Sequence, residues 1–428
     1  MTATPPPSDA SSMPRWTLIG PGLVAAATGV GAGDLVATLV AGAQYGYALL
    51  WAAVAGTVIK VALAEGVGRW TLASGRTVFD GWSSLPGRIG TGGRLNWATA
   101  YFAVYVVVWG FVYGAAAMSA SALPLAALFP AVDLKVFAIA SGLIGLGLTW
   151  WGGYRVFETV MAGLVGLMFV TVVGLAVVVA PDIPRLLTGL WPTLPEGALF
   201  YTLGLIGGVG GTITMAAYGY WLRAKGWRGA GWIRVMRIDN RVAYGMTGLF
   251  VVAMLIVGAE LLHAGGVALA GGDRGLLDLG EVLAARFGPV VATAFLIGFW
   301  AASFSSLIGV WNGVSLMFAD FWAHMRGRPE DDGVGADGAP AFKVYALWLT
   351  FPPMALLFMD RPVALIIAYG ALGSLFMPFL AGTLIWLLNS NRVAPEWRNG
   401  WVSNALMAAA AVLFCVLAGR ELVGLVSG

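Results

Sequence analysis

An apolar stretch long enough to cross a membrane, residues 20–46, is interrupted near its middle by the motif GVGAGD. The motif contains three glycines and ends in a carboxylate, Asp34, which a continuous helix would place in the bilayer interior. Each glycine inside a helix costs about 1 kcal/mol relative to alanine, and a carboxylate at that depth is costly unless something pairs with it. The stretch therefore predicts a helix broken into two halves. Broken helices at the midplane are where transporters expose backbone groups to a substrate.

The composition identifies a membrane protein. Of the 428 residues, 59% are hydrophobic and 11% are charged, which excludes a soluble globular domain. A single cysteine, Cys415, excludes a disulfide framework and a cysteine-based metal site. Two histidines, His263 and His324, exclude a histidine-rich metal site. The net charge of +3 does not indicate nucleic-acid binding, because the basic residues lie in short loops between apolar segments.

Eleven apolar segments of spanning length follow a polar N-terminal tail. The tail, residues 1–14, is rich in Pro and Ser and is predicted to be disordered, and it lacks the pattern of a signal peptide. Residues 15–428 are predicted to form one transmembrane domain. The predicted spans are residues 17–45, 47–68, 97–122, 134–151, 156–180, 199–222, 241–264, 288–316, 341–358, 362–388 and 402–424.

The basic residues predict how the chain is oriented in the membrane. If the N-terminus is cytoplasmic, most of the 24 Lys and Arg residues fall in cytoplasmic segments, as the positive-inside rule requires. An odd number of spans then places the C-terminus outside the cytoplasm. Lys60 belongs to neither side, because it lies within the second span.

A second break is predicted in the sixth span, where residues 205–221 read LIGGVGGTITMAAYGYW. Gly207 and Gly208 are interpreted as close-packing positions, whereas Gly210 and Gly211 are expected in the break itself. The two broken spans are five apart in the chain. This spacing predicts two five-helix units of inverted topology plus an eleventh helix, in an all-α integral membrane protein.

Several motifs resemble the NRAMP family of divalent-metal transporters. The first span begins with Gly20, Pro21 and Gly22 and exits with AGAQYGYALLW at residues 41–51, and the eighth span is rich in serine at residues 301–309. The resemblance covers the chain from about Trp16. It implies a LeuT-like fold, with helices one and six unwound around a central ion.

The departures from the family pattern concern the metal site. The family's DPGN motif aligns with residues 31–34, so that Gly31 replaces its aspartate and Asp34 replaces its asparagine. In the sixth span the family's metal-binding alanine and methionine fall on Gly211 and Thr214. The resemblance therefore implies a metal site formed by Asp34, Gly31, Gly211 and Thr214, with Gly210 and Met215 as further candidates.

These substitutions predict a hard cation as the substrate. Carboxylate, carbonyl and hydroxyl oxygens suit Mg²⁺, whereas a thioether favours softer ions. The chain thus resembles the magnesium-transporting, NRAMP-related branch, with Mn²⁺ as a second substrate. The third and sixth spans carry no acid or histidine to relay protons, so uncoupled transport across a bacterial cell membrane is expected. No cofactor, catalytic residue or obligatory protein partner is expected, and the partners are the ion and the lipid bilayer.

Other interpretations remain open from the sequence. Proton- or sodium-coupled transport of Mn²⁺ or Fe²⁺, transport of a small organic solute such as an amino acid, a membrane enzyme and a non-transporting sensor are the alternatives. Asp34 could cap the second half-helix, Thr214 could bond a carbonyl of its own helix, and Met215 could fill the core. Lys60 and Glu65, five residues apart, are interpreted as structural or interfacial charges. Asp239 is a candidate for a cytoplasmic gate.

Overall fold

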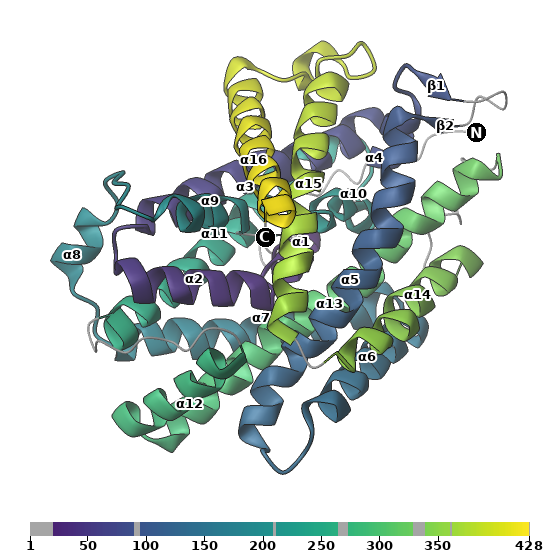
Figure 1. Cartoon of the computed structure of the whole chain (residues 1–428). Coiled ribbons are helices and arrows are strands. Elements are labelled where there is room, and N and C mark those ends of the chain that lie inside the picture. Colours follow the sequence, from purple (N-terminus) through teal and green to yellow (C-terminus); the bar gives the residue numbers. More distant parts are fainter. Residues whose placement is uncertain are drawn as a thin grey trace.

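The computed structural model describes residues 20–89, 95–208, 211–263, 273–327, 339–359 and 362–427, which are almost entirely helical (Figure 1). The predicted tail, residues 1–14, and Gly210 lie outside the described residues. One short antiparallel pair, β1 (Arg88–Ile89) and β2 (Leu95–Asn96), precedes the third span. The remaining elements are helices.

The helices follow one another with short connections. The bounds are α1 (Pro21–Gly29), α2 (Ala32–Tyr45), α3 (Leu50–Ser74), α4 (Val78–Ser83), α5 (Trp97–Leu128), α6 (Leu134–Trp151), α7 (Gly153–Val178), α8 (Ile183–Thr188), α9 (Leu199–Gly208), α10 (Thr214–Ala224), η2 (Ala230–Trp232), α11 (Ile233–Val257), η3 (Gly258–His263), α12 (Asp273–Phe287), α13 (Pro289–Met325), α14 (Pro340–Leu357), α15 (Pro362–Leu388), η4 (Pro395–Trp397) and α16 (Trp401–Ser427).

Each of the eleven predicted spans contains one of these helices or a pair of half-helices. The first span divides into α1 and α2, and the sixth divides into α9 and α10. Within the described residues, 7 helices are long and apolar enough to cross a membrane by length and composition. The two boundaries that differ most from the prediction are the start of α11 at Ile233 and the end of α13 at Met325, because amphipathic turns extend both helices beyond their apolar segments.

Close glycine packing fixes α2 against η3, the π-helical turn that continues α11. A Cβ atom on Gly42 would lie 3.0 Å from the backbone nitrogen of Ala259, and a Cβ atom on Gly258 would lie 3.1 Å from that of Ala43. Small residues allow helix backbones to approach closely inside a membrane. The second half of the first span is therefore held by backbone contact with the seventh span.

Gly258→Val is expected to lower the apparent melting temperature of the purified protein by several degrees, because overpacking costs about 1–3 kcal/mol and here the backbones themselves must separate. The measurement is size-exclusion chromatography after a temperature series. The control is Gly163→Val on α7, where a Cβ atom meets nothing within 4 Å. Equal apparent melting temperatures for the two variants would contradict the proposed close packing.

Candidate functional site

The two helix breaks meet at the centre of the structure. Val30 and Gly31 separate α1 from α2, and Gly211 lies in the break that precedes α10. A Cβ atom on Gly211 would lie 2.9 Å from the Cα atom of Gly29, the last residue of α1. Gly211 has a φ angle of 85°, which glycine adopts without strain. Only glycine satisfies both requirements at this position.

The end of α1 is supported by serines of α13. The last carbonyl groups of a helix lack partners within it, and Ser306 Oγ donates to the carbonyl oxygen of Thr28 at 2.8 Å. Tyr113 on α5 lies 2.9 Å from the same serine hydroxyl. A Cβ atom on Gly31 would lie 3.0 Å from Ser306 Oγ and 3.6 Å from the hydroxyl of Tyr369. The serine-rich segment of the eighth span thus borders the first break.

The second break places a hydroxyl beside Gly211. Thr214 begins α10 and is buried, and its Oγ1 lies 2.7 Å from the position of a Cβ atom on Gly211. Met215 is also buried in the same turn. Of these two side chains, it is Thr214 that lies next to Gly211, which favours an oxygen over a sulfur at this point.

The predicted site residues therefore divide into two groups. Gly31, Gly211 and Thr214 are brought to the meeting point of the breaks. The backbone of Asp34 lies in the first turn of α2, but its side chain is outside the described residues, as is Gly210. Gly207 and Gly208 are helical, at the end of α9.

Lys60 reaches this site although the sequence analysis did not include it. Its side chain is completely buried, and Nζ donates a hydrogen bond to the carbonyl oxygen of Gly211. Glu65, by contrast, pairs with Arg69 at 3.1 Å and with Arg237 at 2.8 Å. The signal that could have identified Lys60 is a charge placed well inside a span, which is functional by default.

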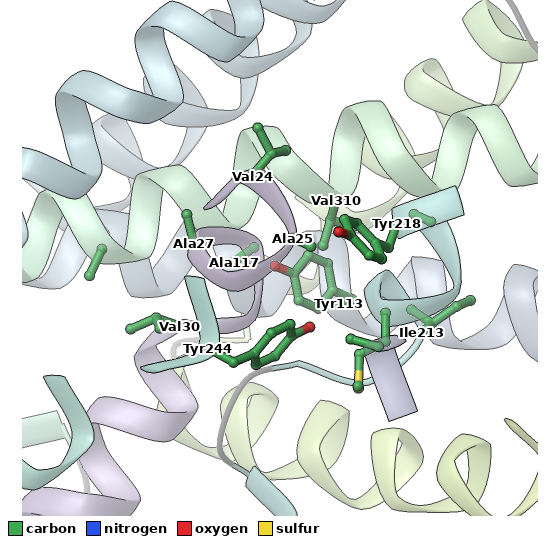
Figure 2. Close-up of a cluster of buried hydrophobic side chains, with 14 of the residues drawn as sticks. Val24, Ala25, Ala27, Val30, Tyr113, Ala117, Ile213, Tyr218, Tyr244 and Val310 are labelled. Carbon is green, nitrogen blue, oxygen red and sulfur yellow. The ribbon is translucent and has the colours of Figure 1, made fainter. Parts of the chain in front are cut away.

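A buried hydroxyl lies in the same region. Figure 2 shows Tyr244 of α11 between Val30 and Ile213, which belong to the two breaks. Its hydroxyl is buried and has no hydrogen-bond partner within the described part of the chain. A buried polar atom without a partner is costly, so the site is suited to a polar occupant.

One wall of the central region is an aromatic column on α5. Tyr101, Tyr105, Trp109 and Tyr113 follow one another at single-turn spacing, with successive ring centroids 5.8, 6.3 and 4.5 Å apart and nearly parallel planes. The hydroxyls of Tyr101 and Tyr105 donate to backbone carbonyl oxygens of α15. The column extends from Tyr113, beside the first break, to the start of α5.

The other end of α1 is bound by a carboxylate. Asp239 on α11 is buried and accepts hydrogen bonds from the backbone nitrogens of Gly20 at 2.9 Å and Gly22 at 2.6 Å. The Tyr218 hydroxyl donates to the same carboxylate at 3.0 Å. Pro21 has no N–H group, and a Cβ atom on Gly22 would lie 2.6 Å from Oδ2. The Gly-Pro-Gly start of α1 is therefore a cradle for this carboxylate.

The arrangement is suited to binding a hard cation. The C-terminal ends of α1 and α9 direct carbonyl groups and the negative ends of their dipoles toward the breaks. Besides the Lys60 ammonium group, the polar groups described there are carbonyl and hydroxyl oxygens, which are the ligands that hard cations prefer. Among the described side chains, no three His, Cys, Asp or Glu residues form a metal cluster.

Comparisons with known proteins place the chain among transporters. A family profile described as "Natural resistance-associated macrophage protein-like" (Nramp) matches residues 22–424. The divalent metal cation transporter MntH of Mycobacterium tuberculosis is 26% identical over 319 residues, which represent 71% of this chain and 70% of that protein.

Solved structures agree in fold. A crystal structure of a mutant of the Eremococcus coleocola manganese transporter matches with a TM-score of 0.74 and 16% identity, covering 95% of this chain and 87% of that one. MhsT in complex with L-phenylalanine matches with a TM-score of 0.54 and 15% identity, covering 92% of this chain and 97% of that one. The predicted all-α, LeuT-like membrane architecture is confirmed.

Proposed function

The chain belongs to the Nramp family, and on this premise we propose that it transports divalent metal cations by alternating access, with Mg²⁺ as the first substrate and Mn²⁺ as the second. The proposal places it in the magnesium-transporting branch of the family. It also places the protein in a prokaryotic cell membrane, with the N-terminus cytoplasmic and the C-terminus outside. Transport is proposed to occur without proton coupling.

The observation that carries the proposal is the meeting of the two helix breaks. Gly211 lies against Gly29, and the Thr214 hydroxyl lies beside it, so unwound backbone and a hydroxyl are presented at one point. Unwound carbonyl groups and half-helix ends coordinate ions in transporters with broken helices. Asp34, two residues into α2, is the proposed charged ligand.

The ligand types support Mg²⁺ in particular. A thioether helps a site to prefer Mn²⁺ and softer ions, and Thr214 stands where the family's methionine is expected. Mg²⁺ is commonly bound through one or two carboxylates with several waters retained.

The absence of acidic side chains and histidine along two central helices supports uncoupled transport. Neither α5 (Trp97–Leu128) nor α10 (Thr214–Ala224) contains Asp, Glu or His, and a proton relay through a membrane needs such groups. A potential that is negative inside contributes about 2.3 kcal/mol per charge per 100 mV. That potential is sufficient to draw a dication inward without a proton partner.

The test is ion influx into proteoliposomes that contain a trapped Mg²⁺ indicator and a pH dye. We expect saturable Mg²⁺ influx that increases with an inside-negative potential and leaves the internal pH unchanged. Acidification that accompanies metal entry would show proton coupling. Influx of Mn²⁺ without Mg²⁺ would overturn the preference, and a sodium current evoked by an amino acid would replace the proposal with transport of an organic solute.

Thr214→Met is expected to shift the Mn²⁺/Mg²⁺ preference toward Mn²⁺ by about tenfold, since a difference of about 1.4 kcal/mol in relative binding gives a factor of ten. The ratio of initial influx rates measures the shift. Met215→Leu, in the same turn, is the matched control and should leave the ratio unchanged. If Met215→Leu is instead the variant that reduces Mn²⁺ transport, the sulfur of Met215 belongs to the site and the assignment of Thr214 is wrong.

A further inference from the structure

The ammonium group of Lys60 is hydrogen-bonded to one of the proposed metal ligands. Lys60 on α3 is completely buried, and its Nζ donates to the carbonyl oxygen of Gly211. The ring of Phe414 on α16 lies 5.3 Å from the same nitrogen, a distance at which an aromatic face attracts a cation. The second break therefore holds a positive charge that belongs to the protein itself.

The packing of α3 explains how this side chain reaches the break. A Cβ atom on Gly56 would lie 2.9 Å from the Cα atom of Ile206, so Gly56 brings the backbone of α3 against α9. Lys60 follows four residues later on the same helix face. Gly211 follows Ile206 by five residues, and its φ angle of 85° takes it out of the helical conformation. Lys60 and the Gly211 carbonyl thus meet where α9 has ended.

An ammonium ion and a hard metal ion compete for the same ligands. Each is bound by oxygen atoms, and a carbonyl oxygen that accepts a hydrogen bond from Nζ is less available to a metal ion. The two positive charges also repel each other, and this repulsion is much stronger in a protein interior than in water. An ion that binds at Gly211 must therefore displace the ammonium group or tolerate it at close range.

We propose that Lys60 sets the affinity of the site, because it competes with the transported ion for the Gly211 carbonyl. This inference rests on the proposed function and deepens it. The competition lowers the affinity for every divalent cation, so that the site responds to an abundant ion such as Mg²⁺ and is not saturated by traces of tighter-binding metals. In this role Lys60 is displaced during each binding event.

The alternative is that Lys60 only anchors α3 to the second break. An anchor and a competitor give opposite results when the charge is removed. Loss of an anchor disorders the Gly211 segment and weakens ion binding. Loss of a competitor frees the carbonyl oxygen and strengthens binding.

The experiment measures Mg²⁺ and Mn²⁺ binding to the purified full-length protein by isothermal titration calorimetry. For Lys60→Gln we expect both dissociation constants to fall by about tenfold or more, because a close charge–charge repulsion is removed. Lys60→Arg retains the charge and should bind as weakly as the wild type. An unchanged or higher dissociation constant in folded Lys60→Gln would overturn the proposal.

A second variant covers the case in which Lys60→Gln does not fold. Lys60→Ala leaves space beside Gly211, and added ethylammonium should raise its dissociation constant for Mg²⁺ but leave that of the wild type unchanged. If ethylammonium has no effect on Lys60→Ala, the competition is refuted.

The two proposals fail in different ways. If the wild type binds no divalent cation but Lys60→Gln does, the proposed function is wrong and the competition is supported. If no variant binds a divalent cation, both are wrong. Tight binding by the wild type that Lys60→Gln weakens leaves the function in place and reduces Lys60 to an anchor.

Discussion

Asp34→Ala is expected to reduce Mg²⁺ influx by about a hundredfold or more. Asp34 is the proposed charged ligand at the start of α2, and removing one member of a buried charge pair costs roughly 3–5 kcal/mol. Every 1.4 kcal/mol corresponds to about a factor of ten in affinity. The measurement is the initial influx rate in proteoliposomes that contain equal amounts of folded protein.

Two controls separate ion binding from folding. Asp34→Asn keeps the shape of the side chain and its ability to cap α2, so it should fold as the wild type does but show most of the transport defect. If Asp34→Asn transports normally, Asp34 acts as a helix cap and the charge is not required. An unchanged elution profile in detergent shows that either variant is folded.

Asp239→Ala is expected to release the N-terminal end of α1 and to expose the inner part of the first span. Its carboxylate accepts hydrogen bonds from Gly20, Gly22 and Tyr218, and each buried donor left without an acceptor costs about 1–3 kcal/mol. A loss of about 3 kcal/mol changes the equilibrium between closed and released α1 by roughly a hundredfold.

The release can be measured by cysteine labelling. The native cysteine, Cys415, is replaced by serine, and Val24→Cys provides a reporter at a position that is 1% exposed. Labelling by a membrane-impermeant maleimide, added on the side that is proposed to be cytoplasmic, should accelerate at least about tenfold in Asp239→Ala. This is less than the full expected shift of the equilibrium. Arg241→Ala, an exposed position on the same helix, is the control. Equal labelling rates in all variants would show that Asp239 does not keep the N-terminal end of α1 closed.

The helices and their breaks could be predicted because their signals are local. Apolar length defines each span, and glycines that weaken a helix mark the two breaks. The family resemblance then placed Gly31, Gly211 and Thr214, and the structure brings these residues to one region. Helix ends such as the start of α11 were predicted less accurately, because amphipathic turns at a membrane surface lack the apolar signal that defines a span.

The contacts that complete the site could not be predicted, because they join residues far apart in the chain. Lys60 meets Gly211 only when α3 packs against α9 at Gly56. Asp239 was recognised as a gate candidate, but its partners were not. They include the backbone nitrogens of Gly20 and Gly22. A single sequence shows which residues are unusual, whereas the packing decides what they touch.

The aromatic column on α5 also has a consequence for proton movement along this helix. A proton wire requires groups that accept a proton on one side and release one on the other. Tyr101 and Tyr105 donate to the carbonyl oxygens of Leu375 and Leu372, and an amide carbonyl has no proton to hand on. Each of these hydroxyls is therefore a dead end for a proton that would move along the column through its hydrogen bond.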